Sequence, residues 1–396
     1  MQHHFKLYAA VQPYEIRYIP ADVRAYTSYV MICLMQVLHG LSLLLFSPFL
    51  YLLERYRARQ TKLPLPYRHI FVTGASSGVG EHLAYSYAAP SVRLTLVARN
   101  EEQLQLVATK CRTLGAEVQV VVADVTDRQR MERAVTEADT ARPLDLVLAV
   151  AGHESAMGKN EDIVSASRQT VEINILGMLN TILPAVPMMR QRRKGQLVVF
   201  SSQLGFLAAP LATDYDSAKV CIRLYGEGLR CLLRPSNVAV NVVVPGAMET
   251  PMMNTLTERA HIPSVPLILP VTNALLFIRE GLARNVGVIA YPSVLTAWNS
   301  AVGGWPSGTR ELFLDAATTS HHVKWRMGEV DEYRYDAARG GKKDDYYVKE
   351  RQAEKARWPG KAVSMNSPRM VVGVDYALSL TLTVAITVCI SGQAGR

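Results

Sequence analysis

The 396-residue sequence has few cysteines and no pattern of ligands typical of a metal site. Its five cysteines are scattered, with no C-x-x-C pair and no histidines at metal-ligand spacing. This distribution argues against a zinc site and against a disulfide framework. We expect the cysteines to be small buried side chains in a reducing compartment.

The sequence also lacks an extended basic surface, although its formal net charge is +9. Much of the excess lies in two short clusters, 55–62 and 190–194, without interleaved aromatic residues. Nucleic acid is therefore not an expected partner. The hydrophobic content of 49% is ample for the core of a globular enzyme.

Charge is absent from the segment 29–53, which is long enough as a helix to cross a hydrocarbon core of about 30 Å. We expect an uncleaved membrane anchor there. Gln36, His39 and Pro48 each cost free energy in lipid, so a monotopic helix or a re-entrant hairpin remains an alternative.

Basic residues are more frequent after this segment than before it, which predicts that the main domain faces the cytosol. The sequence 305–369 is polar and mixes both charges, and we expect an exposed arm. The last segment, 370–396, is apolar up to Ser391 apart from Asp375. We expect it to associate with a membrane, and whether it crosses the bilayer is open.

Apolar, β-branched runs alternate with helical patterns through the middle of the chain. The seven runs are HIFVTG, RLTLVAR, VQVVVAD, LDLVLAVAG, QLVVFSS, VAVNVVVPG and VGVIAYP. Strands this apolar are buried on both faces, which predicts a doubly wound α/β fold with a seven-stranded parallel sheet and helices on both faces. The expected segments are 1–28, an anchor 29–53, a basic linker 54–68, the α/β domain 69–304, and the two C-terminal segments above.

A glycine-rich turn follows the first run, in TGASSGVG. Gly74, Gly78 and Gly80, with Ser76 and Ser77 between them, would let backbone amides approach a pyrophosphate at a helix N-terminus. Because this motif lies between a first strand and a helix, it favours a dinucleotide cofactor.

The end of the second run indicates which dinucleotide binds. Arg99 offers a guanidinium group for a 2′-phosphate, where NAD-dependent proteins place an acidic side chain. We therefore expect NADPH, and the alternative is a solvated surface arginine. Asp124 ends the third run, where it would contact the adenine.

Tyr215 and Lys219 lie one helical turn apart, so their side chains share a face. A nearby ammonium favours phenolate and should lower the pKa of the tyrosine, which makes the pair a tunable proton donor. Ser202 can hydrogen-bond the same substrate oxygen, and Asn174 can hold a water that relays protons to the lysine. Ketone reduction by a hydride cofactor needs this set of groups.

Together these residues resemble the short-chain dehydrogenase/reductase family over roughly 69–292, which implies a Rossmann fold. The motifs are TGASSGVG, AG at Ala151 and Gly152, Asn174, Ser202, YDSAK, and PG at Pro245 and Gly246. The resemblance implies a catalytic tetrad of Asn174, Ser202, Tyr215 and Lys219. It also implies that Val125, Ala151, Gly152, Tyr215, Lys219, Pro245, Gly246 and Thr250 contact the cofactor. Val150 replaces a usual asparagine, which puts one hydrogen bond between strands in doubt.

Within the family, TLVARNEEQL, VVFSSQLG and VGVIAYPSVLTA look like the branch that reduces long-chain sphingoid ketones with NADPH at the endoplasmic reticulum. Reductases of steroid, retinoid or fatty-acyl ketones share much of this pattern and are an alternative. A catalytically idle NADP-binding scaffold at the membrane is a second alternative. A homo-oligomer is left open. The methionine-rich stretch 248–269 is a candidate lid for a lipid tail.

Overall fold

The computed structural model describes residues 21–154, 163–207, 212–259, 268–305 and 310. A parallel sheet has the strand order β3-β2-β1-β4-β5-β6-β7 and confirms the predicted α/β fold. Its strands are β1 (His69–Thr73), β2 (Arg93–Ala98), β3 (Glu117–Val122), β4 (Leu146–Ala149), β5 (Gln196–Phe200), β6 (Ala239–Pro245) and β7 (Val288–Tyr291). Each strand falls within one of the seven apolar runs, except that β3 begins one residue earlier, at Glu117. The expected C-terminal segments lie outside the described residues, Trp305 and Arg310 apart.

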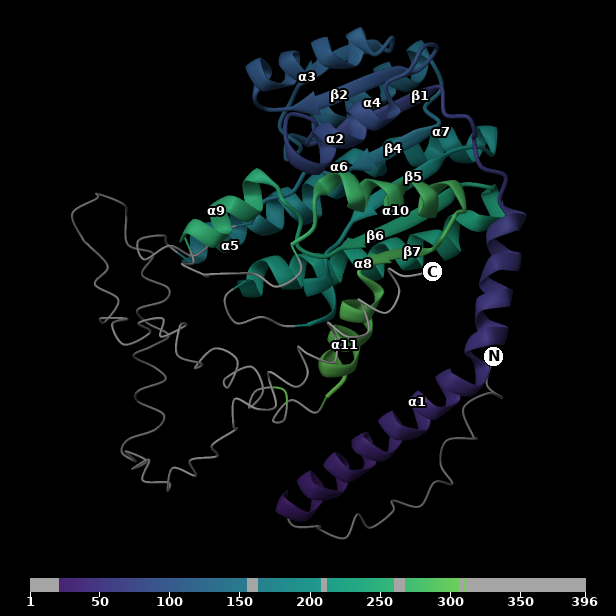
Figure 1. Cartoon of the computed structure of the whole chain (residues 1–396), viewed down its shortest axis with the longest axis vertical. Helices are drawn as coiled ribbons and strands as arrows, with labels where there is room; N and C mark the ends of the chain where they lie inside the picture. Colours follow the sequence, from purple (N-terminus) through teal and green to yellow (C-terminus); the bar gives the residue numbers. More distant parts are fainter. Residues whose placement is uncertain (1–20, 155–162, 208–211, 260–267, 306–309, 311–396) are drawn as a thin grey trace, which may run out of the picture. The chain divides into compact units, whose positions relative to one another are not determined.

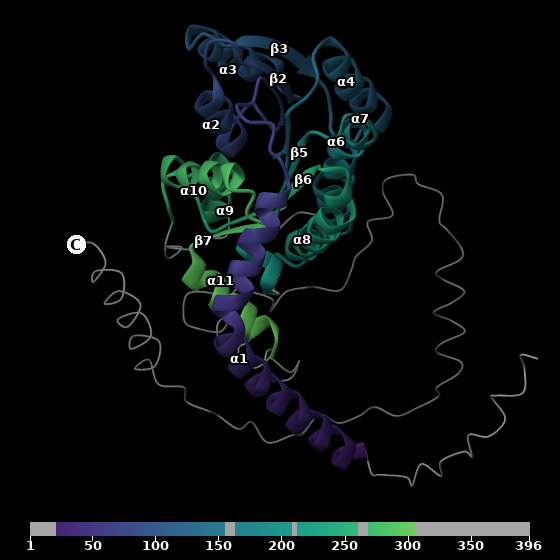
Figure 2. The same ribbon diagram turned by 90° about the vertical axis from the view of Figure 1, so that its right-hand side faces the viewer.

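Helices cover both faces of this sheet, as Figures 1 and 2 show. One face carries α4 (Arg128–Ala141), α6 (Gly177–Ile182), α7 (Ala185–Arg192) and α8 (Thr213–Leu233). The other carries α2 (Gly78–Tyr87), α3 (Glu101–Thr113) and α10 (Val271–Ala283). The remaining helices are α1 (Ala21–Gln60), α5 (Ile163–Val171), α9 (Pro251–Arg259) and α11 (Ser293–Gly303), with short turns η1 (Glu172–Leu176), η2 (Gln203–Phe206) and η4 (Arg234–Ser236).

The alternation of side chains along each strand fills both layers. In β4, Val147 and Ala149 join the cluster under α4 and α8, whereas Leu146 and Leu148 join the cluster under α2, α3 and α10. All four are buried. The strands are apolar throughout because neither face meets water, as the sequence predicted.

The strand order places the candidate site. The chain runs outward from β1 to β2 and β3 in one direction, then returns to β4 on the other side of β1. In open parallel sheets, ligands bind at the carboxyl ends of the strands where this order reverses. The glycine-rich turn follows β1, and Ala151 and Gly152 follow β4, so both lie at this switch point.

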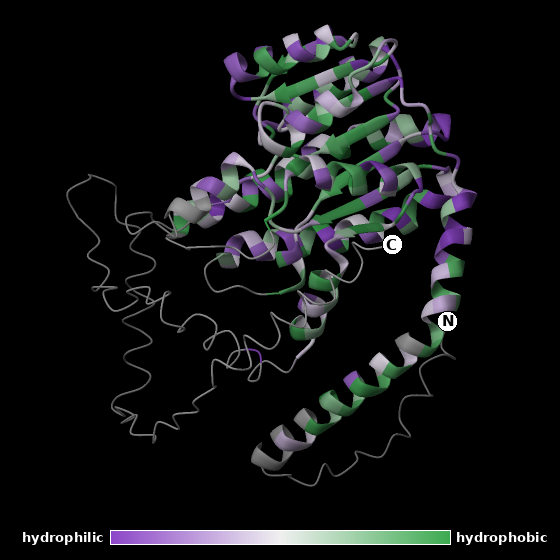
Figure 3. Cartoon of the chain, viewed as in Figure 1, coloured by the Kyte–Doolittle hydropathy of each residue, from purple (hydrophilic) through white to green (hydrophobic). Residues whose placement is uncertain are grey.

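Helix α1 contains the predicted anchor. Its parts Val30–Ser42 and Leu45–Gln60 meet at 61°, and Pro48 lies one turn after the bend, where it removes a helical hydrogen bond. Large apolar side chains are exposed along the helix, among them Leu38, Leu45 and Leu52 at 58%, 77% and 65%. Figure 3 shows the apolar colour along this helix giving way to polar residues near its end. Because these side chains lack a protein partner among the described residues, the helix is suited to an apolar environment.

A second helical run, Val164–Arg192, also has the length and hydropathy of a membrane span. It comprises α5, η1, α6 and α7, and it belongs to the domain core. Met178, Ile182 and Met189 from this run are buried against the sheet. Its apolar character therefore comes from packing on the sheet.

A buried polar network joins α1 to the amino ends of the strands. Arg230 of α8 donates to the carbonyl of Val240 at 2.6 Å and to the Asn285 side chain and carbonyl, each at 2.7 Å. Asn285 in turn donates to the carbonyl of Ala58 at 3.1 Å, and the amide of Gly287 donates to Glu54 at 3.4 Å. These bonds fix the end of α1 to the loop that precedes β7.

We expect Arg230→Met to lower the melting temperature by about 5–10 °C, because the buried oxygens of Val240 and Asn285 lose charged donors. Differential scanning calorimetry of the purified protein measures this change. Arg234→Met, one turn further along, is the matched control, because the only described bond of its side chain is a 3.9 Å contact to Cys231. Equal melting temperatures for the two variants would contradict a structural role for the network.

Candidate active site

The turn between β1 and α2 is built for close approach of backbone. Gly74 has φ +65°, and a Cβ there would stand 2.8 Å from the Cα of Ala151. A Cβ on Gly80 would collide with the carbonyl oxygen of Gly74. Glycine at 74 and 80 is therefore required by the fold, and the turn lies directly against the end of β4.

The start of α2 leaves polar groups available to an anion. Ser77 occupies the N-cap position but makes no side-chain capping hydrogen bond, and it is exposed, while Ser76 is half-buried. A Cβ on Gly78, whose φ is +56°, would stand 3.5 Å from Thr250. The turn thus brings Thr250 from the loop after β6 beside the helix N-terminus. These features fit the pyrophosphate and nicotinamide end of a dinucleotide.

Arg99 and Asp124 stand together at the ends of β2 and β3. The Arg99 guanidinium lies 3.6 Å from the Asp124 carboxylate, and 62% of the Arg99 side chain is exposed. Burial tends to raise the pKa of Asp124, but hydrogen bonds from Thr126 and the Arg99 charge hold it below its usual value. The next residue, Val125, is buried and packs closely on Gly177 of α6. A mostly exposed guanidinium at this position is free to reach an added phosphate.

Helix α8 carries both Tyr215 and Lys219 on one face. The Lys219 ammonium lies 5.1 Å from the Tyr215 ring centroid and donates to the carbonyl of Phe200, at the end of β5, at 2.9 Å. Lys219 is only 5% exposed, and Tyr215 is half-buried. The predicted helical spacing of the pair is confirmed.

Two serines at the end of β5 have different tasks. Ser202 hydrogen-bonds the Tyr215 hydroxyl and accepts from the amide of Leu204 at 3.2 Å, which caps η2. Ser201 is buried and donates to the carbonyl of Lys219 at 2.7 Å. Ser201 therefore attaches α8 to the strand end, and Ser202 lies beside the Tyr215 hydroxyl.

Asn174 lies in η1, a π-helical turn within an otherwise α-helical run. It is buried, and its amide group donates to the carbonyl of His153 at 2.7 Å while accepting from the His153 amide at 3.0 Å. A Cβ on Gly152 would stand 3.0 Å from Asn174 Oδ1 and 3.6 Å from the Lys219 ammonium. π-Turns are frequent at functional sites because they displace one residue from the helical ladder.

Thr73 compensates for the valine at 150. Its hydroxyl donates to the carbonyl of Leu148 at 3.5 Å and accepts from the amide of Ala151 at 3.4 Å. A side chain from β1 thereby bridges to β4, where Val150 cannot. The link between strands that the sequence put in doubt is supplied by another residue, although its bonds are long.

The loop after β6 is held by its neighbours. Pro245 pairs with Tyr291 of β7, and the amide of Gly246 donates to the Tyr291 carbonyl at 2.7 Å. Gln203 donates to Thr296 of α11 at 2.6 Å. These contacts hold the PG turn at the carboxyl edge of the sheet, near the turn that follows β1.

The pKa of Tyr215 shifts in the opposite direction from the sequence prediction. Burial raises the pKa of Tyr215, the negative charge of Glu154 adds to this, and the hydrogen bond from Ser202 opposes it. The expected lowering by Lys219 is therefore not found. Burial lowers the pKa of Lys219 itself to about 8, with Glu154 opposing. Burial thus disfavours the charged form of both side chains in the unliganded chain.

Sequence reasoning missed Glu154, two residues after Gly152. The pKa of Glu154 is raised to about 7: burial contributes most, the negative charge of Asp214 adds to it, and Lys219 opposes the rise. No spacing rule marks this residue, because its proximity to α8 arises from the sheet topology. The sequence also gave no sign that Ser201 binds the backbone of Lys219.

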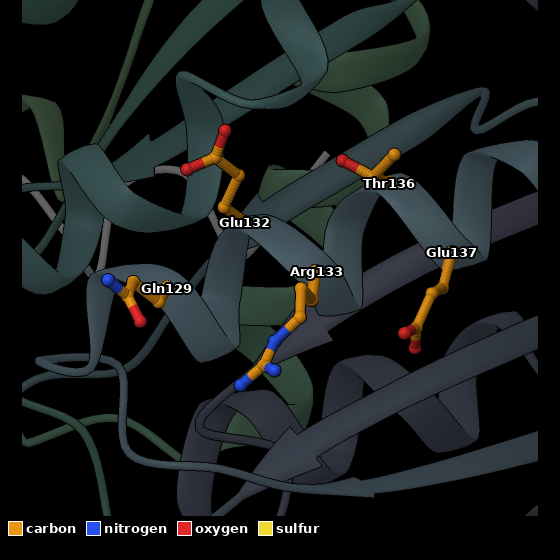
Figure 4. A pocket seen from close by; sticks show the side chains of 5 residues that line it. All are labelled: Gln129, Glu132, Arg133, Thr136 and Glu137. Carbon is orange, nitrogen blue, oxygen red and sulfur yellow. The ribbon is translucent and has the colours of Figure 1, made fainter.

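Figure 4 shows a shallow surface hollow elsewhere on the molecule. Its lining side chains all come from α4: Gln129, Glu132, Arg133, Thr136 and Glu137. It includes none of the residues described above, and we assign it no role. Among the described residues, no cluster of three or more potential metal ligands is present.

Comparison with known proteins identifies the family. A family model described as short chain dehydrogenase matches residues 68–261. The 11-beta-hydroxysteroid dehydrogenase-like 4A protein of Arabidopsis thaliana is 32% identical over 264 residues, which cover 65% of this chain and 88% of the relative. The chain belongs to the short-chain dehydrogenase/reductase family.

One further relative and one solved structure are similar to this chain. The 3-ketodihydrosphingosine reductase of Bos taurus is 34% identical over 196 residues, 48% of this chain and 59% of that protein. A short-chain dehydrogenase from Sphingobium yanoikuyae, solved in complex with NADPH, superposes with a TM-score of 0.54 at 22% identity, covering 62% of this chain and 94% of its own. At that identity the structural likeness supports the fold. Family membership and the glycine turn together support an oxidoreductase that binds a nicotinamide cofactor.

The buried charge of Lys219 leads to a prediction about stability. Its pKa of about 8 in the folded chain lies below the ordinary 10.5, so the unfolded state binds more protons between these values. The burial penalty is full below pH 8 and disappears as pH rises towards 10.5. We expect Lys219→Met to raise the melting temperature by a few degrees at pH 8, and this advantage over wild type to shrink by pH 10.

Scanning fluorimetry of both cofactor-free proteins across this range measures the difference, with the melting temperature of each as readout. Lys110→Met on the exposed face of α3 is the control, because it removes a lysine that is not buried. A Lys219→Met advantage that stays constant from pH 8 to 10 would show that the ammonium carries no such penalty.

Proposed function

We propose that the protein reduces the ketone of 3-ketodihydrosphingosine to the alcohol with NADPH. The observation that carries this is the assembly of Tyr215, Ser202, Lys219 and Asn174 around the carboxyl ends of β4 and β5. The likeness to 3-ketodihydrosphingosine reductase supports the substrate, and the long apolar surface of α1 supports a lipid one.

Each side chain has a defined task in this reaction. When bound, the cofactor supplies the hydride to the carbonyl carbon. The Tyr215 hydroxyl donates a proton to the developing alkoxide, and Ser202 orients and hydrogen-bonds the same oxygen. The pKa of Tyr215 is raised by burial, so the phenol keeps its proton before reaction and gives it up only to a strong base such as the developing alkoxide. Lys219 holds the nicotinamide ribose and, with a water held at Asn174, returns the proton to Tyr215.

Cofactor preference rests on Arg99. Its guanidinium lies at the end of β2 and is mostly exposed, so it can pair with a 2′-phosphate. The neighbouring Asp124 contacts the adenine, and Gly74, Ser76, Ser77, Gly78 and Gly80 receive the pyrophosphate. Val125, Ala151, Gly152, Pro245, Gly246 and Thr250 complete the cofactor contacts.

The proposal includes a place in the cell. Helix α1 anchors the chain in the endoplasmic-reticulum membrane over 29–53, and the basic linker 54–68 keeps the domain 69–304 in the cytosol. The candidate lid 248–269 is described in part: Met248 and Leu269 form a β-bridge at its base, and Met252 on α9 is 38% exposed. Ile262, Val265 and Leu267 lie outside the described residues.

A steroid reductase is the second candidate, because the chain covers 88% of a hydroxysteroid dehydrogenase-like relative. Retinoid or fatty-acyl ketones belong to the same alternative. A non-catalytic NADP-binding scaffold is the remaining one, and the complete tetrad argues against it.

The deciding experiment measures NADPH oxidation by the full-length protein in detergent with 3-ketodihydrosphingosine, a ketosteroid and retinal. We expect turnover of the sphingoid ketone, and turnover of only a steroid or retinal would contradict the substrate.

Tyr215→Phe should lower turnover to below a few per cent while NADPH binding stays nearly unchanged, because only the proton donor is removed. NADPH bound without turnover of any ketone would favour the scaffold.

Arg99→Asp should shift the cofactor preference from NADPH towards NADH, because a carboxylate then repels the 2′-phosphate and can accept from a 2′-hydroxyl. The ratio of kcat/KM for the two cofactors measures the shift. Arg112→Asp on α3 is a control for the change of net charge. An unchanged ratio in Arg99→Asp would mean that another basic side chain binds the 2′-phosphate.

A further inference from the structure

Glu154 is held against the catalytic side chains by its backbone. The residue before it, His153, has both its amide and its carbonyl bonded to the Asn174 side chain, at 3.0 and 2.7 Å. One residue earlier, Gly152 passes close to Asn174 and to the Lys219 ammonium. The strand end therefore brings the backbone of Glu154 to this site.

The Glu154 carboxylate acts electrostatically on the catalytic pair. Its charge raises the pKa of Tyr215 and opposes the lowering of the pKa of Lys219. It is half-buried, and in the part of the chain that the structure describes, no lysine, arginine or histidine nitrogen lies within 4 Å of it. A half-buried carboxylate without an ion pair is suited to a cationic ligand.

The position of the substrate limits what that ligand can be. The ketone oxygen must lie at the Tyr215 and Ser202 hydroxyls, so atoms one or two bonds from the carbonyl carbon lie in the immediate surroundings of that pair. Glu154 follows β4, the strand beside β5, and the backbone just before it bonds Asn174 and approaches the Lys219 ammonium, which places it beside that pair. We propose that Glu154 binds an ammonium group on the carbon next to the ketone, an inference that rests on the proposed function.

This role makes Glu154 a determinant of specificity for 2-amino ketones. A steroid ketone or retinal carries no cation, so binding would desolvate the carboxylate without giving it a partner.

The described titratable groups that interact electrostatically with Glu154 are Asp214, Tyr215 and Lys219, all from α8. Because its pKa stands at about 7 without ligand, Glu154 gains its negative charge between pH 6 and 8. KM for the amino ketone should fall over that interval.

The test compares two substrates on the full-length enzyme: 3-ketodihydrosphingosine, and the same molecule with hydrogen in place of the amino group. We expect Glu154→Gln to raise KM for the amino ketone by about 10- to 100-fold, as for loss of a charge-assisted hydrogen bond. The loss on the deaminated ketone should be at least tenfold smaller. Glu154→Asp should recover part of the difference, and Glu154→Gln should abolish the fall of KM between pH 6 and 8. Glu132→Gln, the same change on exposed α4, is the matched control.

The outcomes distinguish a failure of ammonium binding by Glu154 from a failure of the proposed function. Equal losses on both ketones, with kcat rather than KM affected, would overturn ammonium binding and assign Glu154 to the proton chemistry of Tyr215 and Lys219, while the proposed function stands. A wild-type enzyme that reduces the steroid but neither sphingoid ketone would overturn the proposed function, and ammonium recognition with it. NADPH binding and melting temperature, measured on each variant, establish that a loss does not arise from unfolding.

Discussion

The buried ammonium of Lys219 is the constraint around which the site is organised. A cation that is 5% exposed needs oxygen partners, and the carbonyl of Phe200 supplies one at 2.9 Å. That bond requires α8 to lie directly on the end of β5. Ser201 binds the backbone of Lys219, and Gly205 has no side chain because a Cβ there would stand 2.7 Å from the Ser201 hydroxyl. The close packing of this corner thus follows from the need to hold one charge.

The sheet brings together residues that are far apart in the sequence. Gly74 follows β1, Glu154 follows β4 and Ser202 follows β5, and these three strands are neighbours in the sheet. Parallel strands end at the same edge, so the segments after them meet there. Helix α8 then adds Tyr215 and Lys219 over the end of β5.

Much of this arrangement follows from the sequence, because it rests on patterns that are local. The seven apolar runs predict the strands, the glycines predict the turn, and the four-residue interval between Tyr215 and Lys219 predicts their common face. These features depend on backbone conformation and periodicity. The roles of the predicted site residues stay predictions, although the structure brings Asn174, Ser202, Tyr215 and Lys219 into one corner.

Other features depend on tertiary contacts that no local pattern encodes. The π-turn at Asn174 lies in a sequence that reads as ordinary helix, and the bridge from Thr73 joins residues on two strands. The sequence predicts the wrong sign for the Tyr215 pKa shift, because the neighbouring lysine is visible in the sequence whereas burial, the largest cause, is not. The proximity of Glu154 to α8 likewise appears only once the strands are placed.

The polar groups at the two edges of the sheet differ in how fully they are bonded within the protein. At the amino edge, Arg230 and Asn285 bind one another and the carbonyls of Val240 in β6 and Ala58 in α1, so these donors and acceptors are matched within the protein. At the carboxyl edge, the Ser77 side chain makes no capping bond, Arg99 keeps most of its side chain exposed beside its 3.6 Å contact with Asp124, and Glu154 has no ion pair among the described residues. Matched groups add stability, whereas groups left without matched partners can exchange water for a ligand. The distribution of matched and unmatched groups therefore separates the edge that holds the fold from the edge that binds.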